Sequence, residues 1–155
     1  VFDDLGIPFL GWYSALDKYF SSEEADDGGN GLVNIQLPSE SDEIKIGMRL
    51  DTASKNGLEV IIANKNLTLQ YAEDKYQISA VSIPDEDHIK SIKILLIGEF
   101  VEIYCDNRLS VSTMAYRHAQ GKFEARAGKS ALDFSFHPMA KKLYLQNRDD
   151  LNALV

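Results

Sequence analysis

Charged, planar and aromatic side chains gather in the stretch GEFVEIYCDNRLSVSTMAYR, from Gly98 to Arg117. The residues concerned are Glu102, Tyr104, Asp106, Arg108, Tyr116 and Arg117. Carboxylates and guanidinium groups can bind paired hydroxyls, and an aromatic ring can cover the apolar face of a sugar. The set could therefore bind a saccharide or a partner subunit. It could also be an ordinary wet sheet face with cross-strand ion pairs.

Strand alternation would place these side chains on one face. Val101, Ile103 and Cys105 occupy every second position and point inward, which leaves Glu102, Tyr104 and Asp106 on the opposite face. Carboxylates four positions apart on a strand are roughly 13 Å apart. Retaining glycoside hydrolysis needs them about 5 Å apart. We therefore expect binding rather than catalysis, and no catalytic residue is assigned.

The first thirty residues differ from the rest of the chain. In GWYSALDKYFSSEEAD, apolar residues recur at helical spacing from Trp12 to Phe20, but FLGWYSA and DKYFSS could equally form a strand pair. Trp12 is the only tryptophan. It is a candidate sugar platform, and the alternative is an anchor in the core.

Metal binding is not expected from the cysteine and histidine content. Cys105 is the only cysteine, so neither an internal disulfide nor a multi-thiolate zinc site can form. The oxygen-rich stretch Asp26-Asp27-Gly28-Gly29-Asn30 could bind Ca²⁺, but it lacks EF-hand spacing and also fits a solvated loop. We expect no cofactor, with Ca²⁺ as the exception to test.

Composition fits one globular domain and limits its partners. The chain has 155 residues, of which 45% are hydrophobic, and a formal net charge of −8. Nucleic acid and anionic membranes need concentrated Lys and Arg, so neither is an expected partner. The chain begins with Val1 and shows no signal peptide, as a mature or excised module would.

Short strands separated by turn formers dominate from Gly31 onward. In EIKIGMRL, period 2 places Ile44, Ile46, Met48 and Leu50 on one face and Lys45 and Arg49 on the other. Strands at this spacing predict an all-β, two-sheet antiparallel sandwich. The residues expected in its core are Val33, Ile35, Ile44, Ile46, Met48, Val60, Ile62, Ile94, Leu96, Val101, Ile103, Val111, Phe134 and Phe136.

The stretch IKILLIGEFVEIYCDNRLSVSTMAYR resembles the C-terminal β-sandwich module of glycoside hydrolase family 32, the invertase, levanase and inulinase enzymes. Val101-Glu102-Ile103-Tyr104 matches that family's Val-Glu-Val-Phe stretch, Asp106-Asn107 occupies the turn, and residues 110 to 116 match the outgoing strand. Related fructan-binding modules share the fold. The resemblance implies a concanavalin-A-like (jelly-roll) sandwich over residues 31 to 146, between an N-terminal segment, 1 to 30, and a tail, 147 to 155.

The family's catalytic motifs, an Asn-Asp-Pro-Asn nucleophile motif, an Arg-Asp-Pro motif and a Glu-Cys acid/base motif, do not occur in this chain. The resemblance therefore implies a non-catalytic, lectin-like accessory module that binds a fructan-like or related saccharide through the hairpin set and Trp12. The alternative is a structural module that packs against a catalytic domain or forms a homodimer. An extracellular or periplasmic location is expected.

Overall fold

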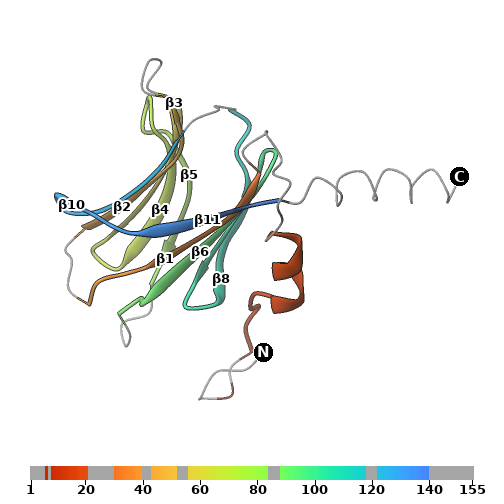
Figure 1. The fold of residues 1–155 in the computed structure, drawn as a ribbon. Coiled ribbons are helices and arrows are strands. Elements are labelled where there is room, and N and C mark those ends of the chain that lie inside the picture. Colours follow the sequence, from red (N-terminus) through yellow and green to blue (C-terminus); the bar gives the residue numbers. More distant parts are fainter. Residues whose placement is uncertain are drawn as a thin grey trace, which may run out of the picture.

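A computed structural model describes residue 6 and residues 8–20, 30–39, 43–51, 56–83, 88–117 and 122–139. Two antiparallel sheets face each other (Figure 1). The five-stranded sheet has the order β11-β1-β6-β7-β8, and the six-stranded sheet has the order β10-β9-β2-β3-β4-β5. The predicted two-sheet antiparallel sandwich is confirmed.

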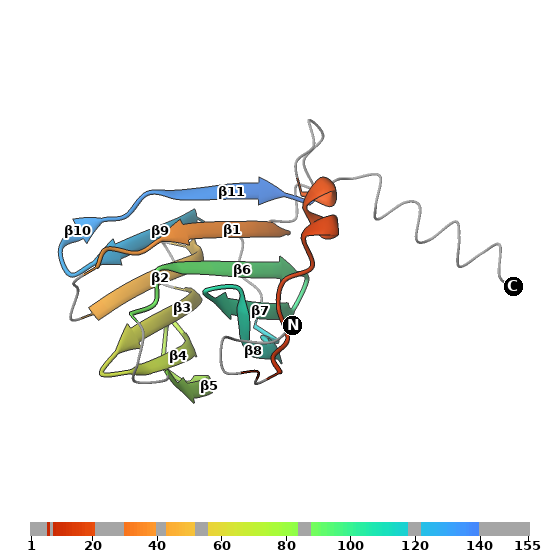
Figure 2. The ribbon, with the colours of Figure 1, turned by 90° about the horizontal axis from the view of Figure 1, so that it is seen from below.

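Eleven strands and one short 3-10 helix make up the described secondary structure. The helix η1 spans Ser14–Tyr19. The strands of the five-stranded sheet are β1 (Gly31–Gln36), β6 (Ser91–Ile97), β7 (Phe100–Cys105), β8 (Arg108–Met114) and β11 (Phe134–Pro138). Those of the six-stranded sheet are β2 (Glu43–Asp51), β3 (Asn56–Ala63), β4 (Asn66–Tyr71), β5 (Gln77–Ser82), β9 (Lys122–Ala127) and β10 (Ser130–Ala131). Figure 2 shows β11, β1, β6, β7 and β8 side by side.

Two hairpins have two-residue turns whose residues tolerate a left-handed backbone. Asn64 and Lys65 join β3 to β4 with φ of 49° and 61°. Asp106 and Asn107 join β7 to β8 with φ of 47° and 65°. Positive φ at both central residues suits the right-handed twist of a hairpin, and Asn and Asp adopt it at low cost. These turns fix the register of the strands that carry the candidate site.

The core lies between the sheets and follows the predicted alternation. Val33, Ile94 and Val101 of the five-stranded sheet and Met48 and Val60 of the six-stranded sheet are completely buried. Each such side chain contributes about 1.5–3 kcal/mol through removal of apolar surface from water. The other predicted core residues also belong to this cluster or pack against it, with one exception. Phe134 is 38% exposed, because β11 lies at the edge of its sheet.

A bulge in β2 reverses the predicted orientation of two residues. The β2–β3 register shifts between Met48 and Asp51, and Arg49 has a φ of 52°. Leu50 lies over Gly47 and Gly57 on the outer face, where a Cβ on either glycine would collide with it. The expectation that Leu50 points inward and Arg49 outward is therefore wrong, because the bulge inserts a residue into the alternation.

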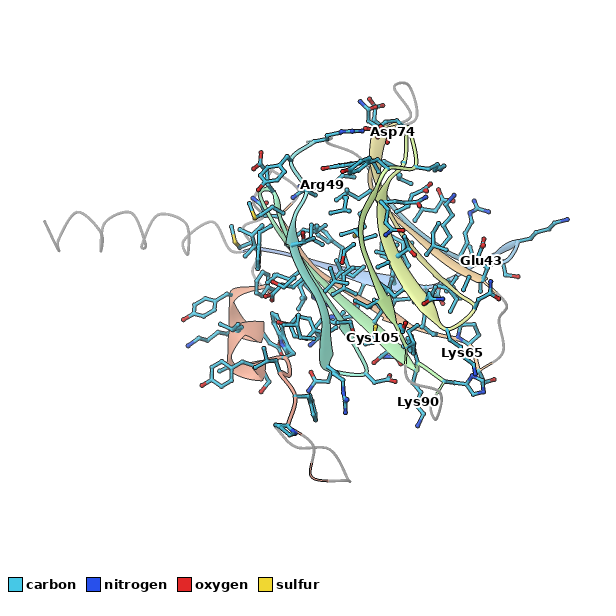
Figure 3. All side chains as sticks on the ribbon, turned by 180° about the vertical axis from the view of Figure 1, so that it is seen from behind. Glu43, Arg49, Lys65, Asp74, Lys90 and Cys105 are labelled. Atoms are coloured by element: carbon cyan, nitrogen blue, oxygen red, sulfur yellow. The ribbon has the colours of Figure 1, made fainter. Side chains whose placement is uncertain are left out.

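Arg49 consequently links the two sheets. Its side chain is 5% exposed and donates hydrogen bonds from Nη1 to the Gly98 carbonyl, at 2.6 Å, and from Nη2 to Asn30 Oδ1, at 3.3 Å. Asn30 Oδ1 also accepts the Gly98 N–H at 2.6 Å. These contacts fix the β6–β7 turn at one end of the sandwich (Figure 3). Among the described residues, no helix is long and apolar enough to cross a membrane.

Candidate functional site

The N-terminal strap, defined here as residues 8–20, covers part of the outer face of the five-stranded sheet (Figure 1). Gly11 bridges to Arg108, and the Leu109 N–H donates to the Leu10 carbonyl at 2.8 Å, so the strap extends the edge of β8. Of the two N-terminal alternatives, the described residues form the helical one, as the short 3-10 helix η1. The strap therefore determines which side chains of the β7–β8 hairpin are exposed to solvent.

Trp12 of the strap and Tyr104 of β7 are buried against each other between the strap and the sheet. Their rings meet edge to face, with centroids 5.5 Å apart, and their exposed fractions are 8% and 7%. Phe20, Leu32 and Met139 complete the surrounding apolar cluster. The expectation that Trp12 and Tyr104 offer open rings to a ligand is not met. Alternation did place Tyr104 on the outer face, but the strap closes over it.

The polar groups around Trp12 are engaged within the protein. Trp12 Nε1 donates to Asp17 Oδ1 at 2.7 Å, and Lys93 Nζ lies 4.8 Å from the centroid of the tryptophan ring. Burial lowers the pKa of Lys93, although the nearby Asp17 carboxylate opposes this shift. The Tyr104 hydroxyl donates to Glu102 Oε2 at 2.6 Å, and burial followed by this contact raises the pKa of Tyr104. The strap is thus fastened by polar as well as apolar contacts.

Asp106 and Arg108 also make contacts within the protein. Asp106 Oδ1 accepts the backbone N–H groups of Lys90 and Ser91, both at 2.9 Å, and so fixes the start of β6. The Arg108 guanidinium carbon lies 4.6 Å from the centroid of the Phe9 ring. These two residues therefore hold the hairpin to β6 and to the strap.

Arg117 belongs to a different group of residues at the end of the sandwich, which we call the Arg117 cluster: Tyr71, Glu73, Asp74, Tyr76 and Arg117. Arg117 Nη1 donates to Glu73 Oε1 at 3.0 Å and to Asp74 Oδ2 at 2.7 Å. Its guanidinium carbon lies 4.3 Å from the Tyr71 ring centroid and 5.8 Å from that of Tyr76. Figure 3 shows Asp74 at this end.

Ion pairing shifts the titration of the cluster. The hydrogen bond from Arg117, followed by that from the Tyr76 N–H, lowers the pKa of Asp74. The two carboxylates, Asp74 first, raise the pKa of Arg117. Asp74 and Arg117 therefore both stay charged throughout the physiological pH range. Each presents fixed donors or acceptors, which suits recognition of neighbouring hydroxyl groups.

Two aromatic rings of this region face solvent. Tyr76 is 62% exposed and stacks loosely on the buried Tyr71, with centroids 6.3 Å apart. Tyr116, next to Arg117 in the chain, is 72% exposed. An open aromatic ring beside fixed charged groups is the combination that a sugar site needs.

A buried carboxylate supports the turn that carries the cluster. Glu59 on β3 is 6% exposed and accepts hydrogen bonds from Lys75 Nζ, at 2.9 Å to Oε2, and from Gln70 Nε2, at 3.0 Å. Lys45 Nζ lies 2.9 Å from Glu59 Oε1. Burial alone would raise the pKa of Glu59, but the hydrogen bonds from Lys75, Lys45 and Gln70 outweigh it and lower that pKa. These contacts hold Lys75, which lies between Asp74 and Tyr76 in the chain, against β3.

The structure therefore divides the seven predicted residues. Trp12 belongs to the strap, Tyr104 lies under it with Glu102 as its hydrogen-bond partner, and Asp106 and Arg108 hold the hairpin. Tyr116 and Arg117 lie at the other end, with partners that sequence reasoning missed. The stretch YAEDKY, residues 71 to 76, predicted only a turn; its aromatic and acidic content is a signal, but nothing local connects it to Arg117.

Metal ligands do not converge in the described part of the chain, where no three His, Cys, Asp or Glu side chains are placed to hold an ion. The stretch considered for Ca²⁺ lies outside the described residues, apart from Asn30. Cys105 is half-buried, and burial raises the pKa of its thiol to about 11. It packs against the core as a small apolar residue.

Comparison with known proteins supports the architecture. No protein-family model matches the sequence, and no curated protein matches it significantly. Among solved structures, the chain is similar to the carbohydrate binding module CBM66 from Bacillus subtilis, with a TM-score of 0.53 and 18% identity over 73% of this chain and 74% of that one. Sheep galectin-11, in complex with glycerol, matches with a TM-score of 0.47 and 7% identity over 76% of this chain and 92% of that one. At this identity, the likeness to CBM66 establishes the sandwich fold.

Proposed function

We propose that this chain is a non-catalytic carbohydrate-binding module whose saccharide lies against the Arg117 cluster. The observation that carries the proposal is the exposed Tyr76 ring beside the ion-paired Arg117, Glu73 and Asp74. The likeness of the fold to a carbohydrate binding module supports it.

The cluster offers complementary chemistry to a sugar. The Tyr76 ring can cover an apolar sugar face, and Tyr116 adds a second exposed ring nearby. Glu73 and Asp74 accept hydrogen bonds from hydroxyl groups, while the Arg117 fork donates to hydroxyl and ring oxygens. Because the ion pairs and Lys75 already hold these groups, little side-chain freedom is lost on binding, which favours affinity.

The proposal has three more specific parts: a fructan as the ligand, a link to a family 32 glycoside hydrolase, and a location outside the cytoplasm. They rest on the resemblance of residues 92 to 117 to that family's C-terminal module. Fructans are neutral, so a chain with a net charge of −8 meets no electrostatic penalty in binding them.

Titration calorimetry with levan, inulin, sucrose and fructose tests ligand and site together. Tyr76→Ala and Arg117→Ala should each weaken binding about tenfold or more, since each removes a central contact. Tyr13→Ala is the matched control for the first, because Tyr13 is 69% exposed on the strap. Arg126→Ala is the control for the second, because Arg126 is an exposed arginine paired with Glu124.

The outcomes separate the parts of the proposal. Absence of heat with all four ligands, in folded protein, contradicts the fructan class. Binding that both site variants and both controls leave unchanged contradicts the Arg117 cluster as the site. Release of reducing sugar by the chain would contradict the non-catalytic assignment.

A second candidate function is that of a structural module. Leu10, Tyr13 and Leu16 are exposed on the strap, and Ile97 and Met114 are exposed at the ends of β6 and β8. Such apolar side chains suit a contact with a catalytic domain or a second copy. Light scattering that finds a stable dimer, or capture by a family 32 catalytic domain, would favour this function.

A further inference from the structure

An open groove of about 750 Å³ lies along the end of β1 and the segment that leads from β10 into β11. Its volume is within the range of small-molecule sites. The groove is lined by Asn34, Gln36, Leu132, Asp133, Phe134 and Ser135, among others. None of these residues belongs to the Arg117 cluster, so the groove is a separate feature of the molecule.

Strand geometry explains why polar groups line this groove. Val33 and Ile35 of β1 point into the core, so Asn34 and Gln36 lie together on the outer face. Ser135 of β11 stands opposite Asn34 in the antiparallel register. Two amides and a hydroxyl are thus held on neighbouring strands, which makes their arrangement rigid compared with that of a loop.

The groove retains unused hydrogen-bonding capacity. Within the described part of the chain, the side chains of Asn34, Gln36 and Asp133 make no hydrogen bond or ion pair to the protein. Ser135 Oγ lies 3.1 Å from His137 Nε2, which leaves the hydroxyl a further site for a ligand. In the Arg117 cluster, by contrast, the charged groups already bind one another.

The composition of the lining selects a class of ligand. An amide both donates and accepts, and so matches a sugar hydroxyl, while the Asp133 carboxylate can accept from two adjacent hydroxyls. Phe134 is 38% exposed and Leu132 is half-buried, so apolar surface is available to a sugar face. Among the described residues of the lining, Asp133 is the one charged side chain, which disfavours an anionic ligand and allows a neutral one.

The groove and the Arg117 cluster lie at opposite ends of the sandwich. Leu37, which lines the groove, donates its N–H to the Lys90 carbonyl at 2.8 Å. Figure 3 shows Lys90 at one end of the molecule and Asp74 at the other. Because the two places lie at opposite ends, each would act as an independent site.

We infer that this groove is a second saccharide-binding site, which takes a neutral oligosaccharide through Asn34, Gln36 and Asp133. The inference takes its ligand class from the proposed function and adds a site to it. A chain with one site at each end can hold two segments of a polysaccharide.

Amide chemical-shift titration of the ¹⁵N-labelled full chain tests this site directly. The probes are the neutral tetrasaccharides nystose, cellotetraose, xylotetraose and maltotetraose, each added to millimolar concentration. We expect at least one of them to shift the amides of residues 34–36 and 132–135 along a saturable curve. Gln36→Ala and Asp133→Asn should each weaken that curve at least about threefold. Gln77→Ala is the matched control, since Gln77 is exposed on β5 outside the groove.

Failure of the two proposals is distinguishable in the same spectra. The Tyr76→Ala substitution lies at the other end of the sandwich, in the Arg117 cluster. Chemical-shift changes at the groove that persist in this variant support the second site, even if the Arg117 cluster binds no saccharide. Absence of saturable groove shifts with all four probes in the folded protein overturns the inference. So does a groove response that Gln36→Ala and Asp133→Asn leave unchanged.

Discussion

A carboxylate as buried as Glu59 is rarely found on the outer face of a sheet, and its neighbours explain why it is tolerated here. Lys75, Lys45 and Gln70 supply the hydrogen bonds that offset its loss of water. Since Lys75 belongs to the turn that holds Asp74 and Tyr76, Glu59 acts as a positioning residue for the Arg117 cluster.

The lowered pKa of Glu59 predicts how stability depends on pH. A carboxyl group whose pKa is lower in the folded state contributes stability above its unfolded pKa of about 4.5, and the contribution is lost as pH falls through the folded value. Glu59→Gln should lower the free energy of unfolding by about 1 kcal/mol at neutral pH, because water screens the half-exposed lysines. Urea titrations should show the difference in stability between the two proteins shrinking as pH falls through the lowered folded pKa of Glu59; equal stability at neutral pH would contradict this role.

Asp106 provides a prediction about a residue that sequence reasoning assigned to binding. Asp106→Ala removes the acceptor for the Lys90 and Ser91 N–H groups and strains a position with a φ of 47°, so stability should fall by about 1–2 kcal/mol. Asp106→Asn keeps an Oδ1 acceptor and should recover most of the loss. Chemical denaturation measures both variants, while saccharide titrations should agree with those of the wild type.

At the scale of elements, the strap is a separate unit added to the sandwich. Its contacts are the apolar cluster around Trp12 and the backbone bonds to the hairpin, and the main core lies on the other side of the five-stranded sheet. Loss of the strap should therefore leave the sandwich folded but expose one face of it.

Substitution of the only tryptophan tests this separation. Trp12→Ala should release the strap, since truncation of a buried tryptophan typically costs about 3–5 kcal/mol. Hydrogen exchange should then lose protection at the Leu109 amide, which donates to Leu10, while the amides of Val60 and Val101 stay protected. Tyr13→Ala, at an exposed position, is the control; global loss of protection in Trp12→Ala would show that the strap is integral to the core.

Strand alternation made the sandwich and its core predictable, because a side-chain period of two can be recognised within a short stretch of sequence. The reversal at Arg49 was not, since a bulge depends on pairing with β3. Burial of Tyr104 depends on a segment some 90 residues earlier in the chain, and Arg117 pairs with carboxylates 43 and 44 positions away. The local pattern predicts which face of a strand a side chain occupies, but distant segments determine whether that face is exposed, as the burial of Tyr104 shows.

At the scale of the whole molecule, the two candidate sites occupy opposite ends of the sandwich. Two sites that engage one insoluble polysaccharide raise the apparent affinity through effective concentration, without any new contact. The wild-type chain should therefore be retained on the polymer more strongly than its affinity for a tetrasaccharide suggests.

Retention on insoluble polysaccharide should fall disproportionately when either end is altered. Tyr76→Ala and Gln36→Ala should each reduce the apparent affinity at least about tenfold, and the double variant should lose most of it. Pull-down on the polymer, with Tyr13→Ala as control, measures this. Each single variant should lose a larger factor of apparent affinity on the polymer than it loses for a tetrasaccharide. If the two factors are equal, the two ends do not bind one polymer together.

The half-buried Cys105 has a practical consequence. With a pKa of about 11, only on the order of one thiol in ten thousand is ionised at neutral pH, so maleimide dyes should modify it very slowly. A fluorophore could then be attached through Lys129→Cys, at an exposed turn, while the native sulfur is left in place. Single-molecule observation of the chain on a fibre thus needs no cysteine-free background.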